Sequence, residues 1–134
     1  MPIKILIVED EGIIALSIEL TLLDQGYQVV GIVDSGAAAI AQAAALRPDL
    51  ILMDVVLQGE IDGLMTAEQI HSRFGIPIVF MTAFSIEAKM NSGHYPLASG
   101  HIRKPINPVQ IDAVIKNVLS QRQHSGAGQP TIDP

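Results

Sequence analysis

The sequence contains no cysteine, which excludes disulfide frameworks, thiolate zinc sites and cysteine nucleophiles. Positive charge is scarce, because 8 lysines and arginines stand against 14 aspartates and glutamates for a net charge of −6. Non-specific attraction to nucleic acid or to an anionic membrane is therefore not expected. No apolar run approaches the roughly 18 residues of a membrane helix, and acidic residues follow the first apolar run too soon for a signal peptide. We expect a soluble, cytoplasmic domain with no direct nucleic-acid partner and no membrane insertion.

Short β-branched runs alternate with longer segments of helical periodicity, and the runs begin about 25 residues apart. Five runs are expected to be strands: Ile3–Val8, Gln28–Val33, Leu50–Met53, Ile76–Met81 and a weak one near His101–Ile102. Three of them are apolar on both faces, as is typical of buried parallel strands. The alternation predicts an α/β fold in which a doubly wound parallel sheet carries helices on both faces.

Four of the intervening segments have apolar residues at helical spacing. These residues are Ile13, Leu16, Leu20 and Leu23 in the first, Ala37, Ile40, Ala41 and Ala44 in the second, Leu64, Ala67, Ile70 and Phe74 in the third, and Ile111, Val114, Ile115 and Val118 in the last. Ser35 is placed to cap the second helix, and Asn107 with Pro108 to begin the last. Between the last two strands, Ser85–Asn91 predicts only a short or irregular fourth helix, because glycine and proline follow closely.

The length of the chain corresponds to one domain, which we expect over residues 1–122. Residues 123–134 lose the periodicity and are expected to form a flexible tail or the start of a linker. No helix-turn-helix or catalytic output domain is recognisable after the last helix. The sequence therefore fits either a stand-alone protein or part of a longer one.

Chemically active residues follow four of the five predicted strands. Glu9 and Asp10 follow the first, Asp54 the third, Thr82 the fourth and Lys104 the fifth. Because ligands of open parallel sheets bind beyond the carboxyl ends of the strands, we expect these side chains to converge. Carboxylates about 5 Å apart repel by about 3 kcal/mol per pair at an effective dielectric constant near 20. A hard divalent cation offsets this repulsion, and all-oxygen ligands suit Mg²⁺ best.

A magnesium ion, a lysine and a threonine hydroxyl around a carboxylate form a receptacle for a phosphoryl group, which the carboxylate attacks in line. Each residue alone has a simpler explanation. Glu9 and Asp10 can cap the first helix, and Lys104 and Thr82 can be an ordinary surface lysine and strand-end hydroxyl. Asp54 is harder to explain in this way, because it stands inside the apolar run ILMDVVL, where a carboxylate needs a partner. Together the positions favour the functional interpretation.

Four short motifs stand at these strand ends in order: VEDE, LILMD, MTA and KP. In order and spacing, from about Ile3 to Leu119, they resemble the response regulator receiver domain, the CheY-like phosphoacceptor of two-component signalling. The resemblance implies a flavodoxin-like fold with a five-stranded parallel sheet in the order 2-1-3-4-5 and five helices. It also implies a phosphoacceptor switch with at most slow self-dephosphorylation, rather than an enzyme.

Carried over by position, the resemblance makes Asp54 the phosphoacceptor. It implies a Mg²⁺ ion bound directly by the carboxylates of Asp10 and Asp54 and by the backbone carbonyl of Val56. Glu9 would assist the ion through water. The loop between Asp54 and the turn at Gly63 is slightly longer than in the commonest family form, which alters the surroundings of the site more than its chemistry.

The resemblance also implies how the phosphoryl group would be held. Thr82, Lys104 and the backbone of Ala83 would bind its oxygens, and a cis peptide bond before Pro105 would set the approach of the lysine. The family's switch position, three residues before the lysine, is His101 here instead of Tyr or Phe. His101 is either an exposed edge-strand residue with no special role or a ring that turns inward with a charge that varies near neutral pH.

Two apolar residues bear on the lifetime of the phosphorylated state. Val56 and Phe84 occupy positions that flank the path of hydrolytic water in this family. We expect them to exclude that water or fail to orient it, which predicts a fairly long-lived acyl phosphate.

The resemblance implies a sensor histidine kinase or phosphotransfer protein as phosphodonor and an output protein of unknown identity. It leaves open a dimer through the face of the fourth helix, fifth strand and fifth helix. A degenerate receiver that only binds other proteins remains an alternative.

Three other classes of protein fit the sequence less well. A phosphatase of the haloacid dehalogenase type resembles the sequence weakly, because Val56 replaces its second aspartate and Asp54 follows the third strand. A flavodoxin-type carrier would need a phosphate loop where VEDEG would repel the flavin phosphate. A calcium loop from Asp54 to Glu60 fails because Val56 and Gln58 are not ligands.

Overall fold

The computed structural model describes residues 2–55, 57, 63–82 and 98–127. Its five parallel strands are β1 (Lys4–Val8), β2 (Gln28–Val33), β3 (Leu50–Asp54), β4 (Ile78–Thr82) and β5 (Ala98–Arg103). Its described helices are α1 (Gly12–Asp24), α2 (Gly36–Leu46), α3 (Gly63–Phe74) and α5 (Pro108–Ala127). The strand order is β2-β1-β3-β4-β5, which confirms the predicted fold and sheet order.

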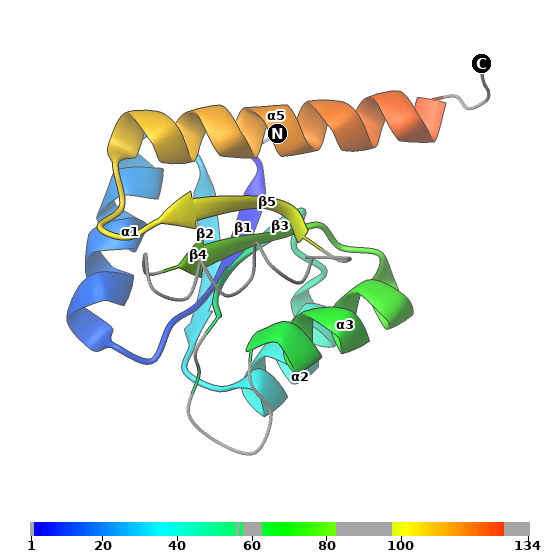
Figure 1. The fold of residues 1–134 in the computed structure, drawn as a ribbon, viewed down its shortest axis with the longest axis horizontal. Coiled ribbons are helices and arrows are strands. Elements are labelled where there is room, and N and C mark those ends of the chain that lie inside the picture. The colour runs from blue at the N-terminus through cyan, green and yellow to red at the C-terminus, as the bar shows by residue number, and fades with distance from the viewer. Residues whose placement is uncertain (1, 56, 58–62, 83–97, 128–134) are drawn as a thin grey trace.

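Helices cover both faces of the sheet, and each face has its own apolar core. Figure 1 shows α5 above the sheet and α2 and α3 below it. Side chains alternate along each strand, so Ile5 and Ile7 pack with the cluster under α1 and α5, while Leu6 and Val8 pack with the cluster under α2 and α3. All four are fully buried. This two-sided burial explains why the central strands are continuous apolar runs rather than alternating ones.

Two predicted helix starts are confirmed by side-chain hydrogen bonds. The Ser35 hydroxyl accepts a hydrogen bond from the backbone N–H of Ala38 at 3.2 Å at the start of α2. The Asn107 side chain accepts from the N–H groups of Val109 and Gln110 at 2.9 and 3.1 Å, and α5 begins at the next residue, a proline. These caps satisfy donors that a helix end otherwise leaves unpaired.

The apolar stripe predicted for α1 lies on its outer face, so that part of the prediction is wrong. Ile13 is 86% exposed, and Leu16, Leu20 and Leu23 are each at least half exposed. The buried residues are instead Ala15, Ile18 and Leu22. Both sides of α1 are apolar, so its periodicity could not distinguish the face that packs on the sheet from the face that meets solvent.

A similar error occurs in α2, where Ala39 and Ala43 are buried and Ala37, Ala41 and Ala44 are exposed. In α5 the prediction holds, because Ile111, Ile115 and Val118 are buried. The helix α5 continues to Ala127, past the boundary predicted at residue 122. Residues 128–134 and the expected fourth helix lie outside the described residues, so the domain boundaries remain predictions.

Within the described ranges, no helix combines the length and apolar character that a membrane span requires.

Candidate functional site

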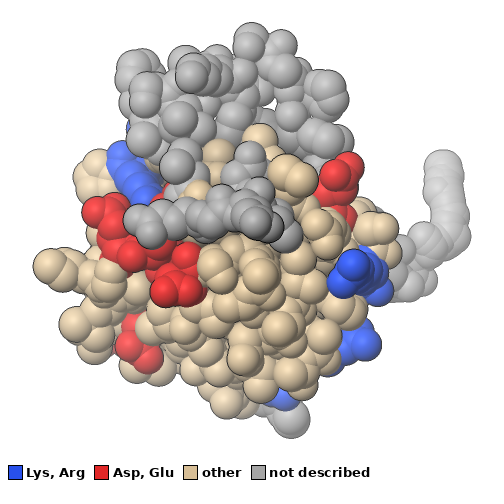
Figure 2. Space-filling model, turned by 90° about the horizontal axis from the view of Figure 1, so that it is seen from below, with Lys and Arg blue, Asp and Glu red and all other residues tan. Residues whose placement is uncertain are grey.

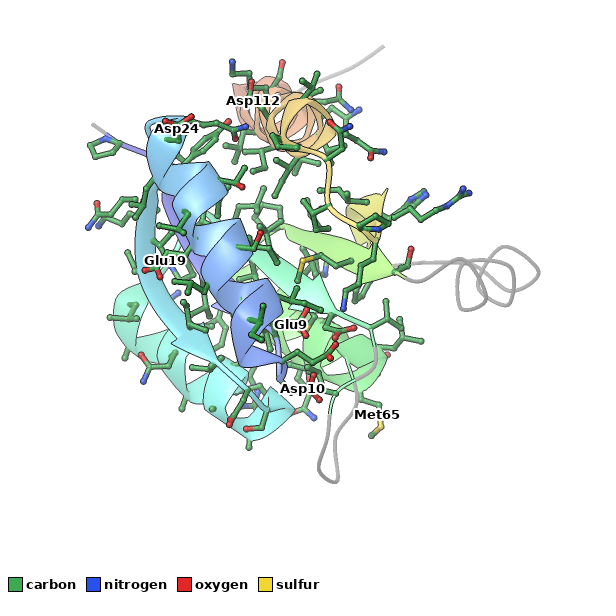
Figure 3. The ribbon with its side chains drawn as sticks, turned by 90° about the vertical axis from the view of Figure 1, so that its left-hand side faces the viewer. Glu9, Asp10, Glu19, Asp24, Met65 and Asp112 are labelled. Atoms are coloured by element: carbon green, nitrogen blue, oxygen red, sulfur yellow. The ribbon has the colours of Figure 1, made fainter. Side chains whose placement is uncertain are left out.

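The sheet brings four strand ends to one edge, as the sequence predicted. Asp54 and Thr82 are the last residues of β3 and β4, while Glu9, Asp10 and Lys104 directly follow β1 and β5. The register aligns these ends, because Val8 pairs with Met53, Asp54 with Met81 and Thr82 with Arg103. Figure 3 shows Glu9 and Asp10 beside the N-terminal end of α1.

Three carboxylates gather at this edge. Glu9, Asp10 and Asp54 each offer an oxygen, and these oxygens all lie within 4.8 Å of one another. Glu9 is 2% and Asp54 7% exposed, while Asp10 is half-buried. Carboxylates so close and so poorly hydrated repel one another unless a cation lies among them. An all-oxygen donor set of this kind fits a hard divalent cation.

Lys104 supplies one positive charge to the cluster. Its Nζ lies 3.0 Å from Oε1 of Glu9 and donates a hydrogen bond of 3.1 Å to Oδ2 of Asp54. The other oxygen of Glu9 accepts a hydrogen bond from the backbone N–H of Glu11 at 3.2 Å. The predicted need of Asp54 for a partner inside an apolar run is thus met by Lys104.

The pKa values of Glu9 and Lys104 are both raised. Burial is the main cause at Glu9, the nearby Asp54 charge adds to it, and the contact with Lys104 opposes both without cancelling the rise in pKa. At Lys104, burial lowers the pKa, but the contacts with Glu9 and Asp54 together outweigh burial and raise it. Lys104 therefore carries its charge at neutral pH, beside a cluster that favours any further cation.

The Thr82 hydroxyl is fully buried and has no hydrogen-bond partner within the described part of the chain. A buried hydroxyl without a partner is unfavourable by about 1–3 kcal/mol. The neighbouring edge position holds Asp54, because β4 pairs with β3. Thr82 is thus placed to donate to an oxygen that binds at this edge.

Gly63 belongs to the framework of the site, although sequence reasoning did not include it among the site residues. A β-carbon at this position would lie 2.6 Å from the Val55 carbonyl oxygen and would also collide with the carbonyl oxygen of Asp54. The Gly63 N–H donates to the Val55 carbonyl at 3.1 Å. Only glycine lets the start of α3 approach the end of β3 this closely. The Asp-Gly pair in the sequence was the available signal, and it indicated only a turn.

Two other predicted positions are described and three are not. The Lys104–Pro105 peptide bond is cis, as the resemblance implied. His101 lies on β5 opposite Phe80 and is exposed. Val56, Ala83 and Phe84 lie outside the described residues.

A cavity of about 300 Å³ adjoins Lys104 on the side of α1. Its lining is mostly apolar and consists of Ile13, Ile14, Ser17, Ile18, Lys104, Pro105 and Ile106. The cavity therefore lies between α1 and the segment that carries Lys104.

The known proteins that this chain resembles point to the same family. The family model described as "Response regulator receiver domain" matches residues 5–116. The phyllosphere-induced regulator PhyR of Methylorubrum extorquens is 32% identical over 124 residues, covering 92% of this chain and 46% of that protein. The transcriptional regulatory protein PdtaR of Mycobacterium tuberculosis is 31% identical over 121 residues, covering 90% of this chain and 58% of that protein. The chain thus spans about half the length of the curated relatives it matches.

Solved structures agree with this assignment. The anti-anti-sigma factor PhyR from Bartonella quintana is 30% identical, with a TM-score of 0.84 over 95% of this chain and 51% of that chain. The signal receiver domain of a modulated diguanylate cyclase from Desulfovibrio desulfuricans G20 is 28% identical, with a TM-score of 0.80 over 93% of this chain and 99% of that chain.

Proposed function

The chain belongs to the response regulator receiver domain family, and we propose that it accepts a phosphoryl group from a phosphohistidine donor onto Asp54. As a receiver domain it is a phosphoacceptor switch of two-component signalling rather than a catalytic enzyme. One observation carries the choice of residue. The Asp54 carboxylate is buried at the end of β3, 3.1 Å from Lys104 Nζ, and the Thr82 hydroxyl, which has no hydrogen-bond partner among the described residues, ends the neighbouring strand.

The side chains suit the transfer chemistry. An Asp54 oxygen would attack phosphorus in line with the bond to the donor nitrogen, which breaks as the new bond forms. Lys104 would neutralise the phosphoryl oxygens, and the Thr82 hydroxyl would donate a hydrogen bond to one of them. The backbone of Ala83, outside the described residues, is proposed as a further donor.

We infer that Mg²⁺ is the cation of this site. The carboxylates of Asp10 and Asp54 would hold it directly, with the Val56 carbonyl as a backbone ligand and Glu9 acting through water. The oxygens of the three carboxylates, within 4.8 Å of one another, support this inference. The bound ion would supply charge neutralisation for the phosphoryl oxygens.

His101 is proposed as the ring that responds to phosphorylation, because it stands three residues before Lys104 on the edge strand β5. If its charge matters, the spectral change near this ring on phosphorylation should differ between pH 6 and pH 8. The long acyl-phosphate lifetime proposed from Val56 and Phe84 is checked by a Phe84→Glu variant, which should lose its phosphoryl group faster than the parent protein.

The phosphodonor is proposed to be a histidine kinase or phosphotransfer protein that packs on α1. Leu16, Leu20 and Leu23, with Ile13, follow the alternating three- and four-residue spacing of a coiled-coil seam, and all are exposed. The helix begins next to the carboxylate cluster, so a helix packed along it reaches the phosphoacceptor edge. Since α1 contains acidic residues and no lysine or arginine, a partner helix with basic flanks is the complementary one.

We propose action in the cytoplasm, and an output partner or second copy that binds the face of β5 and α5. The identity of that partner depends on the longer proteins to which such domains belong.

The test of the proposed function is intact mass after incubation with acetyl phosphate and Mg²⁺, beside an Asp54→Asn variant and a sample with chelator. The account predicts gain of one phosphoryl group by the parent protein in Mg²⁺ alone. No gain, with Mg²⁺ binding established by calorimetry, would favour the degenerate interaction module. Equal gain by Asp54→Asn would place the phosphoacceptor at another residue.

A further inference from the structure

We propose that the cavity between α1 and the segment after β5 binds a small neutral carbonyl compound, with an apolar body and one acceptor oxygen. Its volume of about 300 Å³ is at the lower end of the roughly 300–1,000 Å³ of small-molecule sites. Its lining includes Lys104 but none of the three clustered carboxylates. The cavity is therefore a site beside the carboxylate cluster, and the proposal does not depend on phosphorylation of Asp54.

The walls of the cavity favour an apolar body. Ile13, Ile14 and Ile18 line it from the first two turns of α1, and Pro105 and Ile106 line it from the segment before α5. Ile18 is buried and Ile14 half-buried, whereas Ile13 is 86% exposed. The cavity thus extends from the apolar core to the surface. An apolar group bound there would remove isoleucine surface from water, which is favourable.

The polar groups of the lining favour an acceptor oxygen. Two of the seven lining residues, Ser17 and Lys104, have polar side chains. The Lys104 ammonium has three N–H donors, and Glu9 and Asp54 accept from two of them, which leaves one for an oxygen of the ligand. The hydroxyl of Ser17, an exposed residue, is a second donor. With so few polar side chains, the cavity holds water weakly, and a ligand displaces that water at little cost.

The charges around the cavity disfavour an ionic ligand. A carboxylate would bring a third negative charge to Lys104, which Glu9 and Asp54 already neutralise. An ammonium ion would lie beside the ammonium group of Lys104. Either ion would also lose hydration against the isoleucine side chains. A neutral ketone, lactone or amide avoids these costs and keeps the acceptor oxygen.

The experiment titrates the unphosphorylated protein, in the presence of chelator, with cyclohexanone, cyclohexanecarboxylate and cyclohexylammonium, which share one ring and differ in charge. Binding is followed by methyl NMR of the isoleucines, assigned with isoleucine-to-valine variants. Cyclohexanone should shift Ile14, Ile18 and Ile106 saturably, with a dissociation constant of about 1 mM, which so small a molecule can reach. The two ions should bind at least about tenfold more weakly. Ile70 of α3, packed on the other face of the sheet, is the internal reference.

Two variants test whether the shifts come from this cavity. Ser17→Leu adds apolar bulk to the lining and should weaken cyclohexanone binding by about tenfold or more. Leu20→Phe is the matched control, because it adds bulk on the same helix at a residue outside the lining that is 59% exposed. Its dissociation constant should equal that of the parent protein. Both positions are exposed, so both variants should fold.

Shifts that do not saturate, or that are as large at Ile70 as at Ile18, would overturn the proposal. Tighter binding of either ion would contradict the neutral ligand class, and an unchanged dissociation constant in Ser17→Leu would place the binding elsewhere. The titration needs neither metal nor phosphodonor. Failure of Asp54 to accept a phosphoryl group would therefore contradict the proposed function and leave this result unaffected.

Discussion

The buried Glu9 carboxyl makes the stability of the protein depend on pH. The pKa of Glu9 is raised above its ordinary value of 4.5, chiefly by burial and then by the neighbouring Asp54. The folded protein therefore retains a proton at pH values where the unfolded chain has released it. Stability contributed by that proton is present at low pH and is lost as pH rises through the raised pKa. A bound cation offsets this loss.

We expect Mg²⁺ to stabilise the protein more at pH 7 than at pH 5. At a free concentration 100 times the dissociation constant, the free energy of unfolding at pH 7 should rise by about 2.7 kcal/mol. Urea unfolding followed by circular dichroism, with ionic strength matched by KCl, measures the change. Equal stability with and without Mg²⁺ at pH 7 would argue against a cation at this site.

Gly63 gives a second prediction at the scale of one residue. Gly63→Ala should destabilise the protein by about 1–3 kcal/mol, because its methyl group would collide with the Val55 and Asp54 carbonyls. Gly12→Ala is the matched control, because nothing lies within 4 Å of a β-carbon there. Urea denaturation compares the two variants, and equal midpoints would contradict the close approach of α3 to β3.

At this scale the sequence predicted the residues that converge but not all of their contacts. Asp54, Thr82 and Lys104 were found because strand ends are recognisable and parallel strands share an edge. The contact between Glu9 and Lys104 depends on side-chain length and the packing around it, which no spacing rule contains. The role of Gly63 was missed for a similar reason. The backbone at the end of β3 leaves no room for a β-carbon at the start of α3, and no spacing rule contains this contact.

Among the elements, α1 offers the clearest test, because both of its faces are apolar. Leu22 is fully buried against the sheet, so Leu22→Ala should lower the free energy of unfolding by about 2–5 kcal/mol. Leu20 is 59% exposed, so Leu20→Ala should change it by no more than about 0.5 kcal/mol. Urea unfolding measures both. A larger loss of stability in Leu20→Ala would show that the face predicted from the sequence is the buried one.

The start of α5 is tied to the segment after α1 by Tyr27. Its hydroxyl donates a hydrogen bond of 2.6 Å to Asp112, and Gln25 donates to the Pro108 carbonyl at 2.7 Å. Burial, and then the bond to Asp112, raises the pKa of Tyr27 above its ordinary value of 10.0. The folded protein thus holds the phenol proton longer than the unfolded chain, and the stability that this provides is lost as pH rises into the strongly alkaline range.

Tyr27→Phe should therefore be destabilised by about 1–2 kcal/mol at pH 7, because Asp112 loses a donor. In the parent, absorbance at alkaline pH should show one tyrosine that ionises later than a free phenol, and this late phase should be absent in Tyr27→Phe. A single ordinary ionisation in the parent would contradict the buried hydrogen bond.

Elements were predicted best where local chemistry determines them. Ser35 and Asn107 mark helix starts through their own hydrogen bonds, so both were recognisable in the sequence. The buried face of α1 was not recognisable, since eight of its residues are leucine, isoleucine or alanine at positions that serve either face. Tertiary packing decided which of them are buried.

For the whole molecule, the sheet order follows from the alternation of strands and helices together with the receiver-like motifs. The sheet order also determines where the acidic side chains gather. Figure 2 shows acidic side chains gathered on the side where Figure 1 places α1, the side on which β1 and β3 deliver their carboxylates. The net charge of −6 therefore includes a local concentration of negative charge at the cluster of Glu9, Asp10 and Asp54.

The most direct test of the central claim is to locate the phosphoryl group. Protein phosphorylated with acetyl phosphate and Mg²⁺ is reduced with borohydride, which converts an aspartyl phosphate to homoserine, and is then mapped by peptide mass spectrometry. The account predicts homoserine at residue 54, in amounts that fall when Mg²⁺ is chelated. Homoserine at Asp10, or at no aspartate in protein that binds Mg²⁺, would contradict it.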